Sequence, residues 1–168
     1  GEGIALSLAS EGVRLILIAR NKSDLFSVYK KIGGSKNGHM AICADLTPDQ
    51  NPTKIILKVL KEYKRIDIVV NNIGGDLMIK DPMCSITDWK KLWRLNIEVA
   101  IEINNLVIPV MKKQKCGRIV QISSIASLEN QGTVPYCSIK AALTAYSRSM
   151  GRYLAPFGII MTSVLPGA

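Results

Sequence analysis

The sequence predicts one α/β domain built on a doubly wound parallel sheet, and three observations support this fold class. Short apolar runs of strand length alternate with longer segments of helical periodicity along the whole chain. Each strand and the helix after it take about thirty residues, as right-handed crossovers between parallel strands do. Polar and glycine-containing stretches follow the strands, at the sheet edge where such folds bind ligands. Since no repeat or linker interrupts the pattern, we expect residues 1–168 to form a single domain.

The first half of the chain is expected to alternate helices and strands. The expected order is a helix over residues 4–9, a strand over 13–19, a helix over about 21–32, a turn-rich loop over 33–38 and a strand over 40–44. Gly12 suits the C-terminus of the first helix, and Asn21 and Asp24 offer caps for the second. The first strand is an uninterrupted apolar run, which is typical of a sheet buried on both faces.

The second half continues this alternation. The expected elements are helices over residues 52–63 and about 88–106, strands over 66–70 and 117–122, a helix that contains residues 136–154, and a last strand over 159–164. The first of these helices turns its branched apolar residues inward and its lysines outward. Thr87 and Asp88 are expected to cap the long second helix.

Net charge is the one compositional anomaly, at +9. The lysines gather on predicted helix faces and ends, at Lys54, Lys58, Lys61, Lys64, Lys112, Lys113 and Lys115. A solvated face is the simpler interpretation, and attraction to anionic ligands such as dinucleotide phosphates or an acidic carrier is the alternative. Nucleic-acid binding is poorly supported, because the basic residues lack interleaved aromatic residues.

Cysteine and histidine usage argues against disulfides and against a metal site. Four scattered cysteines, with no C-x-x-C pair, and the single His39 cannot complete a zinc ligand set; the cysteines are Cys43, Cys84, Cys116 and Cys137. We therefore expect free, buried thiols in a reducing compartment, and hence a cytoplasmic protein. No apolar run reaches the roughly eighteen residues that a membrane span needs, so no membrane association is expected.

The stretch with the clearest chemistry is Tyr136-Cys137-Ser138-Ile139-Lys140. A phenol and an ammonium four residues apart lie on one face of a helix, one turn from each other. Alanines and leucines after Lys140 supply helix formers and an apolar stripe. A Y-x-x-x-K pair by itself is a weak signal, because a surface tyrosine one turn from a lysine occurs by chance. Its weight comes from the polar stretches that end the neighbouring strands.

Taken together, these stretches resemble the short-chain dehydrogenase/reductase family over essentially the whole chain. The matching features, in the family's order, are Gly1 opening a helix, Asp45-Leu46, Asn71-Asn72-Ile73-Gly74, Asn96 in the long helix, Ser123-Ser124, Tyr136-x-x-x-Lys140 and Pro166-Gly167. Each alone is weak, and seven in register are specific. The resemblance implies a Rossmann-type sheet with strand order 3-2-1-4-5-6. It also implies oligomerisation, as a dimer or tetramer, through the long helices around Trp93 and Tyr146.

The same resemblance implies that the chain is truncated at both ends. Gly1 matches the last glycine of the family's T-G-x-x-x-G-x-G loop, so the first strand and most of that loop would precede it. A typical member also continues beyond Pro166-Gly167 with a substrate lid and a final strand. We expect a parent protein of about 250 residues, and a fragment that by itself is poorly stable and inactive, since the absent first strand is central in the sheet.

Cofactor choice can be argued from the end of the first expected strand. A carboxylate there would bind the ribose 2′-hydroxyl of NAD, whereas Arg20 can clamp a 2′-phosphate. NADP is therefore favoured over NAD, although stacking of Arg20 on adenine would suit either. The resemblance adds further cofactor-binding residues, namely Gly1, Asp45, Leu46, Asn72, Ile73, Gly74, Tyr136, Lys140, Pro166 and Gly167. Asn71 is expected to tie strands together instead.

The resemblance assigns catalysis to four side chains, Asn96, Ser124, Tyr136 and Lys140. Tyrosine has a pKa of about 10, and lowering it by 2 to 3 units takes roughly 3 to 4 kcal/mol, a scale that one close ammonium can supply. Tyr136 would exchange a proton with the substrate oxygen while hydride moves to or from the nicotinamide. Ser124 would hydrogen-bond that oxygen, with Ser123 as the alternative, and Asn96 would hold a water in a relay to Lys140.

The predicted function is hydride transfer between NADP(H) and a carbonyl or secondary alcohol, on a substrate that could be linked to CoA or an acyl carrier. A non-catalytic dinucleotide-binding or regulatory protein of the same fold is the alternative. An enoyl reductase is less favoured, because those relatives separate the tyrosine and lysine by six residues. Ile73 stands where the family commonly has alanine, and Gly75 follows as a second glycine. Both departures weaken any inference about the substrate.

Overall fold

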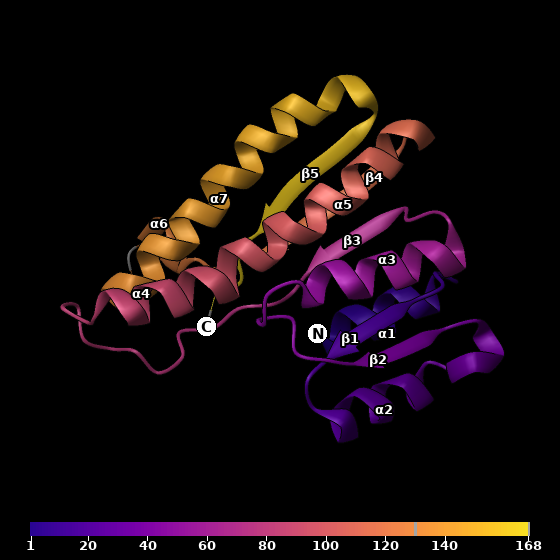
Figure 1. Ribbon diagram of the computed structural model, residues 1–168, viewed down its shortest axis with the longest axis horizontal. Coiled ribbons are helices and arrows are strands. Elements are labelled where there is room, and N and C mark those ends of the chain that lie inside the picture. The colour runs from indigo at the N-terminus through magenta and orange to yellow at the C-terminus, as the bar shows by residue number, and fades with distance from the viewer. Residues whose placement is uncertain (130, 168) are drawn as a thin grey trace. The chain divides into compact units, whose positions relative to one another are not determined.

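The computed structural model describes residues 1–129 and 131–167, and the chain forms two compact units, Gly1–Leu46 and Thr47–Ala168 (Figure 1). All strand pairs within each unit are parallel. Helices and strands alternate along the chain as the periodicity predicts. The α/β class is therefore confirmed.

The first unit has a two-stranded sheet and three helices. Its elements are α1 (Glu2–Ser10), β1 (Ile16–Ala19), α2 (Lys22–Lys31), the 3-10 helix η1 (Gly34–Asn37) and β2 (Met40–Cys43). The Asn21 side chain accepts from the Asp24 N–H and so caps α2 as expected. The first strand starts later than predicted, since the Leu15 N–H donates to Nδ1 of the buried His39, at 3.0 Å.

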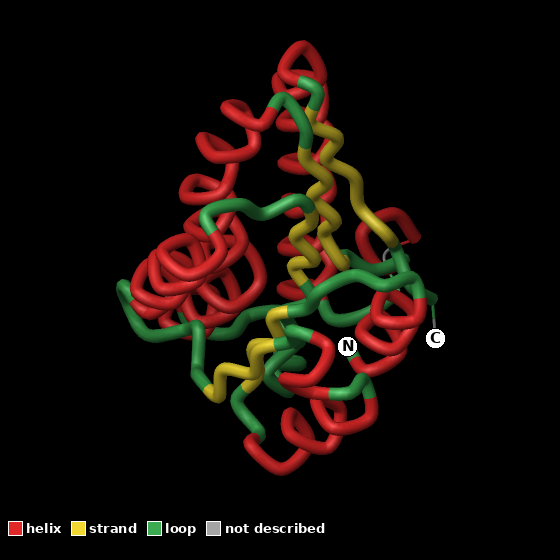
Figure 2. Tube along the Cα trace, turned by 90° about the vertical axis from the view of Figure 1, so that its right-hand side faces the viewer, coloured by secondary structure: helices red, strands yellow, loops and turns green. Residues whose placement is uncertain are grey.

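The second unit has a three-stranded sheet in the order β3-β4-β5. Its elements are α3 (Asn51–Tyr63), β3 (Ile68–Asn71), α4 (Ile86–Trp93), the π-helical turn η2 (Arg94–Glu98), α5 (Val99–Gln114), β4 (Gly117–Ile122), α6 (Ala126–Glu129), α7 (Val134–Leu154), the 3-10 helix η3 (Ala155–Phe157) and β5 (Ile159–Val164). Figure 2 shows its three strands side by side. The neighbours β1–β2, β3–β4 and β4–β5 are those that the predicted strand order requires.

The core of the second unit lies between the sheet and its long helices. Ile119 on β4 and Ile159 on β5 are fully buried. A cluster of Leu92, Ile97, Ile139 and Leu143 joins α4, η2 and α7. This cluster fixes the first half of α7, which carries Tyr136 and Lys140, against the helix that carries Asn96.

Three sequence predictions need correction in this unit. The long helix is capped by Ser85, whose side chain accepts from the Asp88 N–H, and not by Thr87 and Asp88. It contains the π-helical turn at Arg94–Glu98, for which helical periodicity gives no signal. Asn71 ties its strand to a helix, since its Nδ2 donates to Oδ1 of Asn104 on α5 at 3.0 Å.

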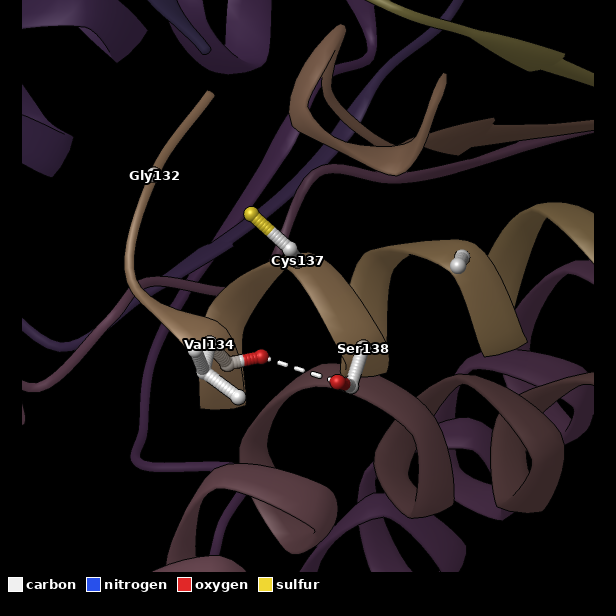
Figure 3. A pocket seen from close by; sticks show the side chains of 5 residues that line it. Gly132, Val134, Cys137 and Ser138 are labelled. Atoms are coloured by element: carbon white, nitrogen blue, oxygen red, sulfur yellow. Dashed lines mark hydrogen bonds between the residues drawn. The ribbon is translucent and has the colours of Figure 1, made fainter. Parts of the chain in front are cut away.

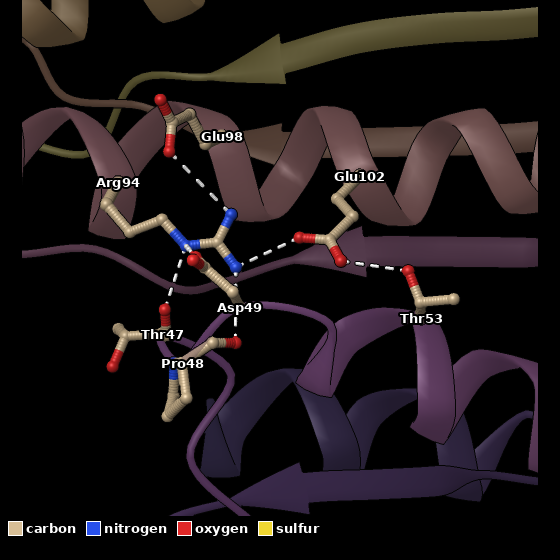
Figure 4. A network of polar contacts seen from close by, with 7 residues as sticks. All are labelled: Thr47, Pro48, Asp49, Thr53, Arg94, Glu98 and Glu102. Atoms are coloured by element: carbon tan, nitrogen blue, oxygen red, sulfur yellow. Dashed lines mark hydrogen bonds and ion pairs between the residues drawn. The ribbon is translucent and has the colours of Figure 1, made fainter.

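Arg94 anchors the π-helical turn to the start of the second unit (Figure 4). Its Nε donates to the Thr47 carbonyl at 2.8 Å, and its Nη2 donates to Glu102 at 2.9 Å. Glu102 in turn accepts from the Thr53 hydroxyl of α3, at 2.9 Å. This partly buried network holds α3 against α5 and braces the turn that presents Asn96.

Two further predictions can be compared with the structure. All four cysteines are free thiols, but the expectation that they are buried is wrong for Cys43 and Cys116, which are exposed, and holds for Cys137. Within residues 1–129 and 131–167, no helix combines the length and the apolar character that crossing a membrane requires.

Candidate functional site

Tyr136 and Lys140 lie one turn apart near the start of α7. Pro135 precedes the tyrosine in the first turn of this helix, where proline is well tolerated. Tyr136 is half-buried, whereas Lys140 is only 3% exposed. The Lys140 Nζ lies 5.6 Å from the centroid of the Tyr136 ring. The predicted pair is therefore present, with its ammonium in a dry environment.

The environment of Lys140 changes its protonation. Burial lowers the pKa of this lysine to about 8, because desolvation penalises the ammonium. Its Nζ donates to the main-chain oxygen of Ile122, at 3.2 Å. With that pKa the side chain is mostly charged at pH 7 and gives up its proton above pH 8. An ammonium has three donors, so others remain for a ligand.

A cavity of about 150 Å³ opens beside this pair. Its walls come from the end of β3, the end of β4 and one face of α7, and its lining residues are Asn72, Ile73, Gly74, Gly75, Ile122, Ser123, Tyr136 and Lys140. The structure thus brings together the Asn-Asn-x-Gly stretch and the Y-x-x-x-K pair, as expected at the carboxyl edge of a parallel sheet.

Two consecutive glycines give this cavity its shape. A Cβ on Gly74 would lie 2.5 Å from the Asn96 Oδ1 and 2.9 Å from the Lys140 Nζ. A Cβ on Gly75 would meet nothing within 4 Å. Both have positive φ, at 153° and 158°. Gly74 is therefore required for close approach of two candidate catalytic residues, while Gly75 borders open space.

Asn96 is held by main-chain groups on both sides of its amide. Its Oδ1 accepts from the Gly75 N–H at 3.1 Å, and its Nδ2 donates to the carbonyls of Gly75 and Leu92, each at 2.9 Å. The side chain is 1% exposed. Asn96 thus fixes the Gly74-Gly75 segment against the π-helical turn.

The two adjacent serines have different surroundings. Ser123 is buried and lines the cavity, and its hydroxyl donates to the Lys140 carbonyl at 3.1 Å and lies 2.8 Å from the Thr144 hydroxyl. Ser124 is half-buried, and its Oγ accepts from the Ala126 N–H at 3.2 Å. The Ser123 hydroxyl is used by the fold, whereas the hydrogen of the Ser124 hydroxyl stays available for a ligand.

A second cavity, of about 420 Å³, lies along the first turns of α7 (Figure 3). It is lined by Gly132, Val134, Cys137, Ser138 and Ala141, and the Ser138 hydroxyl donates to the Val134 carbonyl at 2.8 Å. A Cβ on Gly132 would lie 3.7 Å from the Tyr136 ring. This larger cavity offers no acid–base pair, so we place the chemistry in the smaller one.

The remaining predicted cofactor residues are distributed over the two units. Pro166 lies beside the segment after β4, since its carbonyl accepts from the Ile125 N–H at 3.0 Å, and Gly167 follows it. In the first unit, Gly1 is the N-cap of α1. Arg20 is exposed directly after β1, and its carbonyl accepts from the Cys43 thiol at 3.3 Å. Asp45 and Leu46 follow β2, as expected.

Four residues contribute to the site without a role predicted from the sequence, although Gly75 stood out there as a second glycine. Gly75 binds both ends of the Asn96 amide, and the Ile122 carbonyl receives the Lys140 ammonium. Thr144 and Ser127 bond to each other and, through Thr144, to Ser123. The Gly-Gly pair and a threonine one turn after Lys140 were visible signals, whereas a main-chain acceptor has no signature in a sequence.

Known proteins resemble this chain over nearly its whole length. The family model described as short chain dehydrogenase matches residues 1–168. An uncharacterized oxidoreductase of Staphylococcus saprophyticus is 30% identical over 169 residues, which cover 99% of this chain and 72% of that protein. Two similar structures also match nearly the whole chain. A short-chain dehydrogenase/reductase of unknown function from Caenorhabditis elegans, solved with cofactor, is 31% identical with a TM-score of 0.88, covering 99% of this chain and 64% of that one. ElxO with NADP bound is 26% identical with a TM-score of 0.85, covering 99% and 69%.

The strand pairing and these matches lead to one conclusion. The fold is a Rossmann-type, doubly wound parallel α/β fold, and the chain belongs to the short-chain dehydrogenase/reductase family.

Proposed function

We propose that the protein transfers hydride between NADP(H) and a carbonyl or secondary alcohol, with Tyr136 as the general acid and base. The observation that carries this proposal is the buried Lys140 beside Tyr136, at a cavity formed by the ends of two parallel strands. Family membership supports an oxidoreductase. The reaction class then follows from the chemistry of the pair.

The residues fit a nicotinamide dinucleotide. Gly74 and Gly75 leave main chain exposed at the cavity, and Lys140 keeps donors that suit ribose hydroxyls. When bound, the nicotinamide supplies or accepts the hydride. Asn72, Ile73 and Gly74 would border the cofactor in the second unit, together with Pro166 and Gly167. In the first unit, Gly1, Arg20, Asp45 and Leu46 would do so.

In the direction of reduction, the Tyr136 hydroxyl donates a proton to the substrate oxygen as that oxygen gains charge. The Lys140 ammonium favours the resulting phenolate, because an opposite charge nearby stabilises the ionised form. Ser124 donates a hydrogen bond to the same oxygen and so orients the carbonyl. Ser123 has its hydroxyl committed to Lys140 and Thr144, which favours Ser124 in this role. Asn96 positions the Gly74-Gly75 segment and supports the relay to Lys140.

The test of catalysis is turnover in the full-length protein, because the chain spans about 72% of the curated relatives it matches. We expect NADPH oxidation with some member of a carbonyl panel, and Tyr136→Phe should reduce it by about a thousandfold while NADPH still binds. Wild-type turnover by Tyr136→Phe would refute the catalytic assignment. Cofactor binding without turnover on any carbonyl or alcohol would instead favour the non-catalytic, regulatory alternative.

NADP is the proposed cofactor, and Arg20 is the reason. Arg20 directly follows β1, and its guanidinium can bind the 2′-phosphate of NADP. A carboxylate at this position would repel that phosphate. ElxO, at 26% identity, has NADP bound. We expect Arg20→Ala to raise KM for NADPH by roughly 10- to 100-fold and to change KM for NADH little. Equal effects on both cofactors would indicate adenine stacking and remove the preference over NAD.

The remaining assignments follow from the family. We propose a small-molecule substrate, for which a CoA or carrier-linked thioester stays open, and assembly as a homo-oligomer, a dimer or tetramer. Trp93, partly exposed on α4, is a candidate interface residue. We further propose a cytoplasmic location, with neither nucleic acid nor membrane as a partner. Size-exclusion chromatography with light scattering tests the oligomeric state.

A further inference from the structure

Three buried hydroxyls form a chain beneath the candidate site. Ser123 follows β4, Ser127 belongs to α6 and Thr144 belongs to α7. Their exposed fractions are 5%, 9% and 6%. The Thr144 Oγ1 lies 2.8 Å from the Ser123 Oγ and 3.2 Å from the Ser127 Oγ. One threonine therefore connects the two serines from within the packed interior.

The two outer contacts of this chain have defined donors, Ser123 and Thr144. The Lys140 carbonyl can only accept, so Ser123 gives its one hydrogen to it, at 3.1 Å. The Thr144 hydroxyl donates to the Ser127 Oγ at 3.2 Å, so the 2.8 Å contact between the Ser123 and Thr144 hydroxyls shares one of these two hydrogens. The Lys140 carbonyl accepts at one end of the chain and the Ser127 Oγ accepts at the other.

Two consecutive residues, Ile122 and Ser123, therefore hydrogen-bond to Lys140, one to its side chain and one to its main chain. Its ammonium donates to the Ile122 carbonyl at 3.2 Å, and its carbonyl accepts from the Ser123 hydroxyl. Both contacts fix the distance between the end of β4 and the turn of α7 that carries Tyr136. Ser124, the proposed partner of the substrate oxygen, is the next residue along the chain.

We propose that Thr144, with Ser127 behind it, is a positioning residue that holds the Ser123 hydroxyl beside the Lys140 carbonyl and thereby sets the geometry of Ser124, Tyr136 and Lys140. This proposal rests on the proposed function, since it assigns how that site is held. Thr144 touches neither substrate nor cofactor and acts only through Ser123. Without its hydroxyl, Ser123 and Ser127 would each lose a partner in a buried place.

The experiment compares Thr144→Val, which keeps the shape, with Thr144→Ser, which keeps the hydroxyl. In the full-length protein we expect Thr144→Val to lower kcat by roughly tenfold, with KM for NADPH unchanged, because a small displacement of catalytic groups is costly. The acid limb of the profile of kcat against pH should also shift in Thr144→Val. Thr144→Ser should restore both the wild-type kcat and the wild-type pH profile. The matched control is Ser147→Ala on the same helix, whose buried hydroxyl has no partner among the described residues.

The outcomes separate this proposal from the proposed function. Wild-type kcat and pH profile in Thr144→Val, failure of Thr144→Ser to rescue, or an equal fall in Ser147→Ala would each overturn the positioning role while leaving catalysis by Tyr136 intact. If Thr144→Val does not fold, Ser127→Ala tests the outer link, with about a threefold fall expected and no fall refuting it. A readout without turnover is NMR titration of the Lys140 side chain in the cofactor-free protein, which Thr144→Val should shift and Ser147→Ala should not.

Discussion

Two lysine–tyrosine pairs lie at opposite ends of α7, and only one of them has the properties of a site. At the far end, the Lys112 Nζ is 4.6 Å from the Tyr153 ring, 3.8 Å from the Phe157 ring and 3.1 Å from the Tyr153 hydroxyl. That pair is tighter than Lys140 and Tyr136, whose ring–ammonium distance is 5.6 Å. Tyr153, however, is 57% exposed. Proximity of the two side chains therefore does not identify the functional pair.

Desolvation and position in the sheet make the difference. Burial lowers the pKa of Lys140 to about 8 and places its charge where low polarity strengthens electrostatic effects. The ends of β3 and β4 open a cavity beside it. Lys112 instead covers two aromatic rings at the surface, where a cation–π contact contributes about 0.5–1 kcal/mol. The comparison predicts that changes at the two lysines will have very different consequences.

The largest expected effect is on turnover. Lys140→Met should reduce turnover by roughly a hundredfold or more, because it removes both the charge near Tyr136 and the bond to Ile122. Lys112→Met should change turnover by less than about twofold, since its contacts are solvated. Steady-state assays of both variants in the full-length protein decide this. Comparable losses would mean that turnover falls with the loss of either lysine, Lys112 on α5 or Lys140 on α7, and the distinction drawn from burial would be wrong.

A second, smaller effect sharpens the picture of the site with the two glycines. Gly74→Ala would place a methyl group 2.5 Å from the Asn96 Oδ1 and 2.9 Å from the Lys140 Nζ, so both must move. We expect roughly a hundredfold loss of turnover or less. Gly75 has nearly the same φ as Gly74, but a Cβ there would meet no other atom within 4 Å. Gly75→Ala therefore measures the cost of backbone strain without a steric clash. Its loss should be several-fold at most, and equal losses would show that strain alone matters.

The sequence predicted the fold well because period and order are local properties. The strands Gly117–Ile122 and Ile159–Val164 have the bounds that their apolar runs predict. The order of the motifs predicted that Tyr136, Lys140 and the Asn-Asn-x-Gly stretch lie close together, and residues of all three line one cavity. Tertiary contacts explain the failures: the His39 ring binds the amide of Leu15, and Ser85 lies closer than Thr87 to the point where the helix must start.

What the sequence could not reveal was which of two adjacent serines is already committed. Ser123 and Ser124 both follow the same strand, and the resemblance assigned the role to Ser124 with Ser123 as the alternative. The answer depends on Thr144, one turn beyond Lys140, whose hydroxyl reaches back to Ser123. A contact between a strand end and a helix interior has no periodicity, so only the three-dimensional structure shows it.

The smallest expected effect is on stability, and its sign can be worked out. The pKa of Lys140 is about 8 in the folded protein against 10.5 as the reference value. Between these values the unfolded state binds more protons, so the free energy of unfolding should rise with pH from about 8 toward 10.5 and show no such slope below 8. Burial raises the pKa of Tyr146, so that residue contributes the opposite sign above pH 10. Denaturant titrations of the cofactor-free protein from pH 7 to 10 avoid most of that second effect. The free energy of unfolding of the wild type minus that of Lys140→Met should rise with pH from about 8 toward 10. A difference that does not change with pH would show that Lys140 keeps its ordinary protonation despite its burial.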